Sequence, residues 1–280
     1  MAKRTNFLAR WLTKSGSKEN SHMASSSSYV PDAEAYRRGS QLGESWRGIP
    51  VAQAGSASIP ADTNPLWDYF SKHHTGPGIW KWQHYFDIYH RHLAQFRNRR
   101  PTIVEVGVYS GGSLGMWQNY FGDGCKIHGV DIEKACKCYE SKGISIHIGD
   151  QEDRDFWLAF REQVGPVDVL IDDGGHTPEQ QMVTLEEILP YMPPGSVYIC
   201  EDVHRVANRF ADFAAGLISQ LNAQNRIEGS ILQATTTPLQ QSLASIHVYP
   251  YVYVIEKHTQ PPSLFISPKQ GTQWQPFYDR

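Results

Sequence analysis

The stretch Val169-Leu-Ile-Asp-Asp-Gly-Gly-His176 is followed later in the chain by a run of similar pattern, Tyr198-Ile-Cys-Glu-Asp-Val-His204. Each run is apolar, rich in β-branched residues, and ends in carboxylates, which is typical of a strand that finishes at a polar edge. Residues 178–191, which lie between them, have the length and apolar spacing of one helix. Strand, helix and strand make a βαβ unit whose two strands run parallel and side by side. The two runs therefore predict an open α/β sheet with carboxylates at the edge where such sheets bind ligands.

Three acidic side chains are expected to converge at this edge, namely Asp173, Glu201 and Asp202. Grouped carboxylates repel one another unless a cation or a proton neutralises them, and their oxygen atoms suit Mg²⁺ better than a softer metal. A plainer interpretation makes Glu201 and Asp202 a helix-capping pair on a solvated loop. His176 is a candidate general base, because its ordinary pKa lies near neutrality. The alternative is a structural histidine that caps the preceding turn, and His204 is then the next candidate base.

A second ligand-binding signal lies upstream, in Thr102-Ile-Val-Glu-Val-Gly-Val-Tyr-Ser-Gly-Gly-Ser113. This strand breaks into a glycine turn, where the backbone can approach a ligand closely, and then opens a helix with free N–H groups. Its spacing differs from the dinucleotide pattern G-x-G-x-x-G and favours an adenosyl ligand. Two later strands end in acids: Asp131 is placed for a ribose hydroxyl pair and Asp150 for an adenine amino group. Each signal alone is equally consistent with a tight turn or a helix N-cap, but their order and spacing favour a ligand site.

In this order, the motifs resemble the class I S-adenosylmethionine-dependent methyltransferases, and more narrowly the Mg²⁺-dependent macrolide-sugar (mycinamicin-type) O-methyltransferases. The resemblance covers residues 80–257, and residues 271–275 also look like this group. It implies a Rossmann-like α/β fold with a mostly parallel seven-stranded sheet, helices on both faces and an antiparallel C-terminal hairpin. The motifs that carry it are Glu105–Ser113, Gly129–Asp131, Gly149–Gln151, Ile171–His176 and the pair Glu201-Asp202.

The resemblance also implies roles for individual residues, with S-adenosyl-L-methionine and Mg²⁺ as cofactors. Asp173, Glu201 and Asp202 would hold the metal, and His176 would be the general base. The residues assigned to S-adenosyl-L-methionine are Glu105, Gly107, Ser110, Gly111, Ser113, Asp131, Asp150, Gln151 and Asp172. Gly175 stands where a serine is common, and residues 203–207 also depart from the pattern, which leaves the substrate open. The expected reaction is methylation of a small-molecule hydroxyl, such as one of a sugar or a vicinal diol, which the cation would orient and acidify.

Composition agrees with one catalytic domain. The 280 residues are 40% hydrophobic, enough for a single core, and the net charge of −3 argues against a nucleic-acid partner. The four cysteines do not form a disulfide framework, so an intracellular, reduced protein is expected. No apolar run reaches the ~18 residues needed to span a bilayer. A homo-oligomer remains open.

The chain is expected to have three parts. Residues 1–62 are predicted to be disordered, residues 63–100 to form N-terminal helices that include a lid, and residues 101–280 to form the catalytic domain. Residues 1–18 carry five basic residues and no acid, so a mitochondrial or plastid transit peptide is an alternative to a cytoplasmic location. A solvated tail or a cloning leader explains the same residues.

Aromatic and aliphatic side chains recur at helical spacing from Trp80 to Phe96, which predicts an amphipathic helix packed on the sheet. Five histidines at 73, 74, 84, 90 and 92 lack the spacing of a metal site and are expected to be solvated or in the core. Downstream, residues 206–221 are expected to form a helix, and residues 243–249 and 251–256 an edge hairpin.

Two other functions remain in play. One is a nicotinamide-dependent oxidoreductase, which the glycine spacing and the three carboxylates disfavour. The other is a catalytically idle binding protein on a methyltransferase scaffold, which the presence of His176 with all three carboxylates disfavours.

Overall fold

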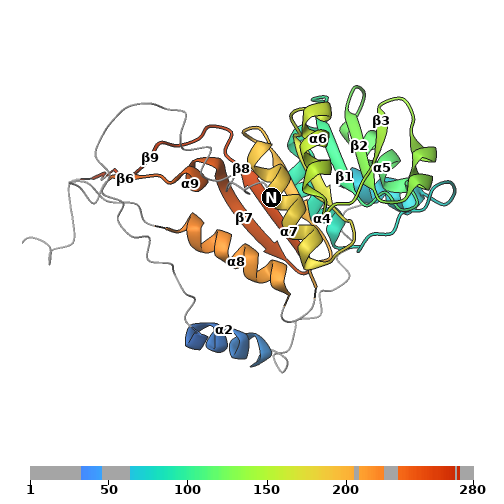
Figure 1. The fold of residues 1–280 in the computed structure, drawn as a ribbon. Helices are drawn as coiled ribbons and strands as arrows, with labels where there is room; N and C mark the ends of the chain where they lie inside the picture. Colours follow the sequence, from blue (N-terminus) through green and yellow to red (C-terminus); the bar gives the residue numbers. More distant parts are fainter. Residues whose placement is uncertain (1–32, 46–63, 205–207, 224–232, 269, 272–280) are drawn as a thin grey trace, which may run out of the picture. The chain divides into compact units, whose positions relative to one another are not determined.

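A computed structural model describes residues 33–45, 64–204, 208–223, 233–268 and 270–271 (Figure 1). The chain divides into two units, residues 1–53 and 54–280. The described part of the first unit is helix α2 (Ala33–Ser45), whose side chains are all exposed. This helix lies within the segment predicted to be disordered, and an ion pair of 2.6 Å between Glu34 and Arg37, one turn apart, favours it. Disorder over residues 1–62 stays a prediction. The basic segment with the proposed targeting role lies outside the described residues.

The second unit is built on a seven-stranded sheet with the order β3-β2-β1-β4-β5-β8-β7. The first five strands pair in parallel, β8 is antiparallel to β5, and β7 is antiparallel to β8. This confirms the mostly parallel sheet and the C-terminal hairpin, whose strand β8 lies inside the sheet. The strands are β1 (Thr102–Val106), β2 (Lys126–Asp131), β3 (Ile144–Ile148), β4 (Val169–Asp172), β5 (Val197–Cys200), β7 (Leu243–Tyr249) and β8 (Val252–Lys257). A small antiparallel pair, β6 (Gln233–Thr235) with β9 (Leu264–Ile266), was not predicted.

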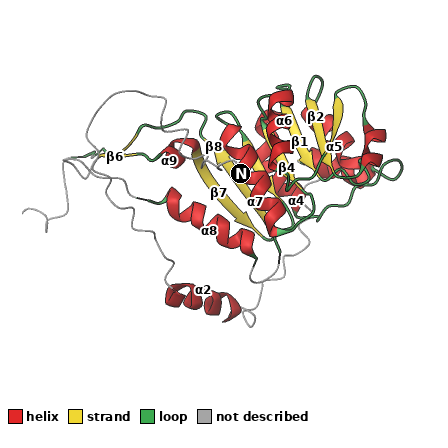
Figure 2. Ribbon diagram, viewed as in Figure 1, coloured by secondary structure: helices red, strands yellow, loops and turns green. Residues whose placement is uncertain are grey.

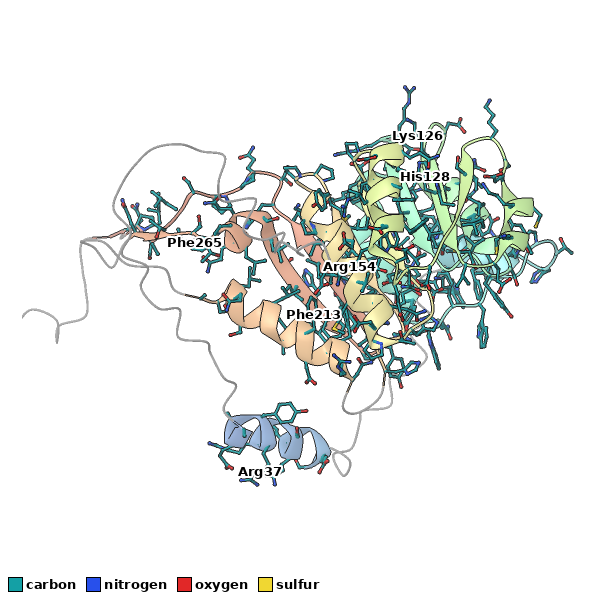
Figure 3. All side chains as sticks on the ribbon, viewed as in Figure 1. Arg37, Lys126, His128, Arg154, Phe213 and Phe265 are labelled. Carbon is teal, nitrogen blue, oxygen red and sulfur yellow. The ribbon has the colours of Figure 1, made fainter. Side chains whose placement is uncertain are left out.

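Helices cover both faces of the sheet, as expected (Figures 1 and 2). One apolar cluster joins the sheet to α3 (Pro65–Lys72), α4 (Tyr85–Leu93) and α5 (Gly112–Phe121). The other joins it to α6 (Arg154–Val164), α7 (Pro178–Ile188) and α8 (Arg209–Leu221). Arg154, labelled in Figure 3, ties α6 to α7 by ion pairs with Glu186 and Glu187. The short α9 (Pro238–Ser242) precedes the hairpin. Every described helix is too short or too polar to cross a bilayer.

Local sequence explains where the crossover helix between the two carboxylate runs begins. Thr177 accepts a hydrogen bond from the backbone of Gln180, whose side chain reciprocates, and Pro178 occupies the first turn. This capping box satisfies two backbone donors that the helix itself leaves free. The helix then continues as a 3₁₀ turn at Leu189–Tyr191, so its predicted extent is confirmed.

The prediction of one helix from Trp80 to Phe96 is wrong at its start. Helix α4 begins at Tyr85, and residues 78–84 form a connecting segment that crosses the edge of the sheet. The apolar period of the helix is real, because Phe86, Tyr89 and Leu93 are buried. The segment before it departs from helical geometry as Lys81 reaches the carboxylates at the strand ends, a tertiary contact that overrides local preference.

Candidate active site

A cavity of about 1020 Å³ opens at the carboxyl ends of the five parallel strands β1 to β5. Its volume is that of a ligand site. Nine of the residues predicted from sequence line it, namely Gly107, Ser110, Asp131, Asp150, Gln151, Asp173, His176, Glu201 and Asp202. The other four, Glu105, Gly111, Ser113 and Asp172, are not among the lining residues. The topology therefore brings most of the predicted site to one place.

The glycine turn after β1 is fixed by two close approaches. A Cβ atom on Gly107, whose φ is +88°, would lie 2.0 Å from the carbonyl oxygen of Asp173, so only glycine fits between the ends of β1 and β4. On its other side, Asp131 Oδ2 accepts hydrogen bonds from the backbone of Val108 at 2.9 Å and of Tyr109 at 3.0 Å. Asp131 therefore anchors the turn to the end of β2 while it faces the cavity.

Two residues predicted to bind the cofactor, Glu105 and Asp172, do not line the cavity and form hydrogen bonds with neighbouring side chains. Glu105 is fully buried and accepts hydrogen bonds from Ser113 Oγ at 2.7 Å and Trp117 Nε1 at 3.0 Å, which join α5 to β1. Asp172 accepts from Gln151 Nε2 at 3.1 Å, and burial raises the pKa of its carboxyl to about 7. Direct contact of either residue with a cofactor stays a prediction.

Gln151 links the cofactor side of the cavity to the loop that carries His176. Its Oε1 accepts a hydrogen bond of 2.8 Å from the backbone of Gly175, and a Cβ atom on Gly174 would lie 2.0 Å from the same oxygen. The loop therefore packs directly on this amide, which explains why glycine occupies position 174.

Lys81 is the main feature that sequence reasoning missed. Its Nζ donates to Asp173 Oδ2 at 2.6 Å and to Glu201 Oε2 at 3.0 Å, and it lies 3.6 Å from Glu105 Oε1. Its side chain is only 3% exposed. Burial disfavours the charged amine, but the three carboxylates outweigh it and raise the pKa of Lys81 above its ordinary value. An internal ammonium thus supplies part of the neutralisation that grouped carboxylates require.

Aromatic donors from α4 and the preceding segment form hydrogen bonds with Glu201 and Asp202. Tyr89 donates to Glu201 Oε1 at 2.6 Å. Tyr85 and Trp82 donate to Asp202 Oδ1 at 2.6 and 3.1 Å. Burial, together with these carboxylates, raises the pKa of both tyrosines, so they remain protonated donors. The only signal for them in the sequence is the spacing of Tyr85 and Tyr89 on one face of the helix.

His176 lies beside two of the carboxylates without a close hydrogen bond. Its Nε2 is 3.6 Å from Asp202 Oδ2 and 4.0 Å from Asp173 Oδ1. Its Nδ1 is buried and has no hydrogen-bond partner among the described residues. The backbone of His176 has a φ of +58°, a conformation that costs roughly 1–3 kcal/mol for a residue other than glycine. Strained backbone and an unpartnered buried nitrogen are features that cluster at functional sites.

The structure gathers a slightly different set of ligand atoms from the one predicted for a metal. One atom each from Asp173, His176 and Asp202 lies within 4.8 Å of the other two. Both oxygens of Glu201 lie within 3.2 Å of the ammonium of Lys81. Lys81 therefore occupies the position beside Glu201 and Asp173 where a cation could bind.

Comparisons with known proteins agree with this geometry. Residues 104–203 match a family model described as a methyltransferase domain. This stretch of the chain is therefore similar to a methyltransferase domain. It includes β1, the glycine turn, the loop of His176 and the pair Glu201-Asp202, and so carries the main chemical groups of the cavity. The resemblance to the sugar O-methyltransferases, stated from the motifs, is confirmed.

Curated relatives share part of their length with the chain. It is 32% identical over 157 residues to the demethylmacrocin O-methyltransferase of Streptomyces fradiae, which is 54% of this chain and 38% of the relative. It is 33% identical over 135 residues to the 8-demethyl-8-alpha-L-rhamnosyl tetracenomycin-C 2'-O-methyltransferase of Streptomyces olivaceus, covering 46% of this chain and 35% of the relative. The chain thus spans less than half the length of either enzyme.

A solved structure has the same fold. The MycE methyltransferase of the mycinamycin pathway, in complex with Mg, SAH and mycinamycin VI, superposes with a TM-score of 0.57 at 24% identity. The superposition covers 82% of this chain and 62% of the other. The likeness establishes the Rossmann-like methyltransferase fold of the second unit.

Proposed function

We propose that the protein is an S-adenosylmethionine-dependent, Mg²⁺-dependent O-methyltransferase that acts on a hydroxyl of a small molecule, in the first instance a sugar of a secondary metabolite. The observation that carries the proposal is the cavity in which the glycine turn and Asp131 lie on one side and His176 with the strand-end carboxylates on the other. A methyl donor and a hydroxyl acceptor would meet between the two sides.

The cofactor side supports an adenosyl ligand. Asp131 presents a carboxylate beside the glycine turn, and Asp150 is exposed at the end of the neighbouring strand β3. S-adenosylmethionine supplies an electrophilic methyl group, which an aligned oxygen takes by in-line displacement. The turn and Asp131 would orient this group, and the loop packed on Gln151 would exclude water behind it.

The metal side fits Mg²⁺, because its donors are mainly carboxylate oxygens. We assign the ion to Asp173, Glu201 and Asp202, with Lys81 leaving Glu201 when it binds. When bound, the cation would orient and acidify a coordinated hydroxyl. Tyr85 and Trp82 would keep Asp202 in place by their hydrogen bonds.

His176 is assigned the proton transfer. Its Nε2 faces Asp173 and Asp202, at 4.0 Å and 3.6 Å. A hydroxyl that enters the cavity between this ring and the glycine turn can pass its proton to the imidazole as the oxygen attacks. The positive φ of His176 holds the ring over the ends of the strands.

Exposed aromatic side chains at the cavity favour a sugar acceptor. Trp80 is 85% exposed, Trp82 52% and Tyr109 73%, and all three line the cavity. Large aromatic faces beside polar groups suit a ligand that has both apolar and hydroxyl-bearing surfaces. The curated relative whose name includes a rhamnosyl group supports the same substrate class.

Isothermal titration with S-adenosylhomocysteine tests the cofactor assignment. We expect saturable binding that Asp131→Ala abolishes. The variant removes the carboxylate that accepts hydrogen bonds from the glycine turn and that is the proposed acceptor for the ribose hydroxyls. Glu162→Ala, on the exposed side of α6, is the matched control and should bind as the wild type does. Binding of NAD in place of S-adenosylhomocysteine would favour the oxidoreductase alternative.

Methyl transfer to a panel of glycosides, with and without chelator, tests the remainder of the proposal. We expect activity that excess EDTA removes and Mg²⁺ restores, and that Asp202→Asn lowers while S-adenosylhomocysteine still binds. Full activity in EDTA would show that the three carboxylates have a structural role and do not hold a metal ion needed for turnover.

A further inference from the structure

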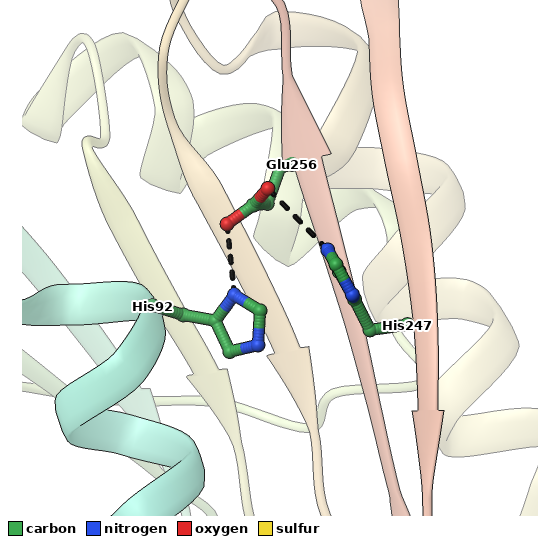
Figure 4. A group of neighbouring side chains, drawn as sticks. All are labelled: His92, His247 and Glu256. Atoms are coloured by element: carbon green, nitrogen blue, oxygen red, sulfur yellow. Dashed lines mark hydrogen bonds and ion pairs between the residues drawn. The ribbon is translucent and has the colours of Figure 1, made fainter.

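A second cluster of metal-ligand side chains lies away from the cavity, on the C-terminal hairpin (Figure 4). It combines His92 near the end of α4, His247 on the edge strand β7, and Glu256 on β8. One ligand atom from each lies within 4.8 Å of the other two. The Glu256 carboxylate stands between the rings, with Oε1 2.8 Å from His92 Nδ1 and Oε2 3.4 Å from His247 Nε2.

The local structure aims these side chains at one another. Glu256 pairs with Ser245 across the hairpin, and His247 follows Ser245 by two residues, so all three project from the same face of the sheet. Helix α4 brings His92 onto this face, where the residue is 4% exposed. The side chains of His247 and Glu256 are 37% and 29% exposed, so solvent reaches the cluster from their side.

Further polar groups hold the ligands in orientation. The hydroxyl of Tyr249 lies 2.9 Å from His92 Nε2, which leaves Nδ1 directed at Glu256. Ser245 Oγ lies 3.0 Å from Glu256 Oε2 and from His247 Nε2. A ring nitrogen fixed by an outer hydrogen bond while the other faces the ligand atoms is the usual arrangement around a protein-bound metal.

We propose that His92, His247 and Glu256 form a site for Zn²⁺ or a similar borderline divalent metal. Two imidazoles and one carboxylate are a ligand set that such metals take in proteins, whereas Mg²⁺ prefers oxygen atoms alone. A cavity of about 510 Å³, lined by His92 and Glu256, adjoins the cluster and admits a water molecule as a fourth ligand.

The site would join α4 to the hairpin. Helix α4 also carries Tyr85 and Tyr89, which donate to Asp202 and Glu201 in the candidate active site. A metal on His92 would therefore fix the far end of the helix that positions these donors. Its role is structural and does not depend on the proposed methyltransferase activity.

Titration of the chelator-stripped full chain with Co²⁺, followed by visible absorption, and with Zn²⁺, followed by calorimetry, tests the proposal. We expect one site that survives His176→Ala, because that variant changes the active-site cluster only. His247→Ala and Glu256→Gln should each weaken this site by more than ~100-fold, and Tyr249→Phe, which removes an outer hydrogen bond, by ~10–100-fold. His90→Ala is the matched control, since His90 lies on the same helix but contacts Tyr120, and it should leave binding unchanged.

Three outcomes would overturn the site. They are no binding of Co²⁺ or Zn²⁺, binding that His247→Ala and Glu256→Gln leave intact, and binding that only His176→Ala removes. In each case the three side chains join α4 to the hairpin by hydrogen bonds alone, without a metal. Circular dichroism of each variant in chelator shows whether it is folded. If His247→Ala fails to fold, Glu256→Gln, which keeps the shape of the side chain, decides the question.

Discussion

The two clusters of histidine and carboxylate differ in how the chain holds them. In the candidate active site, His176 and Asp202 lie in loops after strands and have positive φ angles of 58° and 53°. In the hairpin cluster, His92, His247 and Glu256 lie within regular helix and strands. Ring nitrogens differ in the same way: His176 Nδ1 is buried without a partner among the described residues, whereas both nitrogens of His92 are hydrogen-bonded.

The difference indicates different tasks. Strained backbone and an unsatisfied nitrogen cost free energy and persist where a ligand or a reaction needs them. Satisfied groups on regular elements hold structure together. The first cluster is therefore expected to control turnover and the second to control stability, and the predictions below separate these effects.

The largest effect is expected for His176→Ala. Loss of a general base typically lowers the rate by ~10²–10⁴, so kcat should fall within that range while S-adenosylhomocysteine affinity changes little. The pH dependence of kcat should also lose the inflection that one group produces in the wild type. Steady-state kinetics across pH measure both.

His247→Ala provides the contrast for this experiment. It removes one of the two histidines of the hairpin cluster and should leave the pH profile of kcat unchanged. The assignment of turnover to the first cluster and of stability to the second is wrong if His247→Ala changes that profile. It is also wrong if His176→Ala turns over normally with the wild-type profile.

A somewhat smaller effect is expected for Lys81→Met. The variant leaves Asp173 and Glu201 without their buried ammonium, and breaking a buried ion pair by removal of one partner costs about 3–5 kcal/mol. Urea denaturation should show a loss of this order in the free energy of unfolding. Because a cation can replace the lost charge, added Mg²⁺ should stabilise Lys81→Met more than the wild type.

The double variant Lys81→Met with Glu201→Gln is the control for this charge argument. Removal of the opposing carboxylate should recover part of the lost stability, since neighbouring changes in one ionic network are not additive. A Lys81→Met protein as stable as the wild type without Mg²⁺ would contradict the role given to Lys81.

The same contrast explains which residues of the two clusters could be predicted from the sequence. The groups of the first cluster follow strands directly, in Asp172-Asp173-Gly-Gly-His176 and Glu201-Asp202, so strand order alone brings them together. Lys81 was missed because it reaches the site from a segment whose apolar spacing continues that of α4, and a period cannot reveal where a helix is interrupted. His92 was expected to be a core or solvated residue, since its partners lie far along the chain and only the folded hairpin brings them to it.

The smallest effect is expected for Glu256→Gln, measured in chelator so that no metal contributes. The hydrogen bond from His92, the largest cause, holds the pKa of Glu256 at about 2, below its ordinary value of 4.5, although burial opposes the shift. A carboxyl whose pKa is lowered on folding stabilises the protein above its unfolded pKa, and that stability is lost as the pH falls toward the folded value. After allowance for partial exposure, the variant should be less stable by about 1–2 kcal/mol at pH 7, and this difference should shrink below about pH 4.5. Guanidinium denaturation at several pH values measures it, with Glu162→Gln on exposed α6 as the control. If the difference in free energy of unfolding between wild type and variant stays constant from pH 7 to pH 3, the hydrogen bond from His92 does not keep Glu256 charged. The contact between α4 and the hairpin would then have another cause.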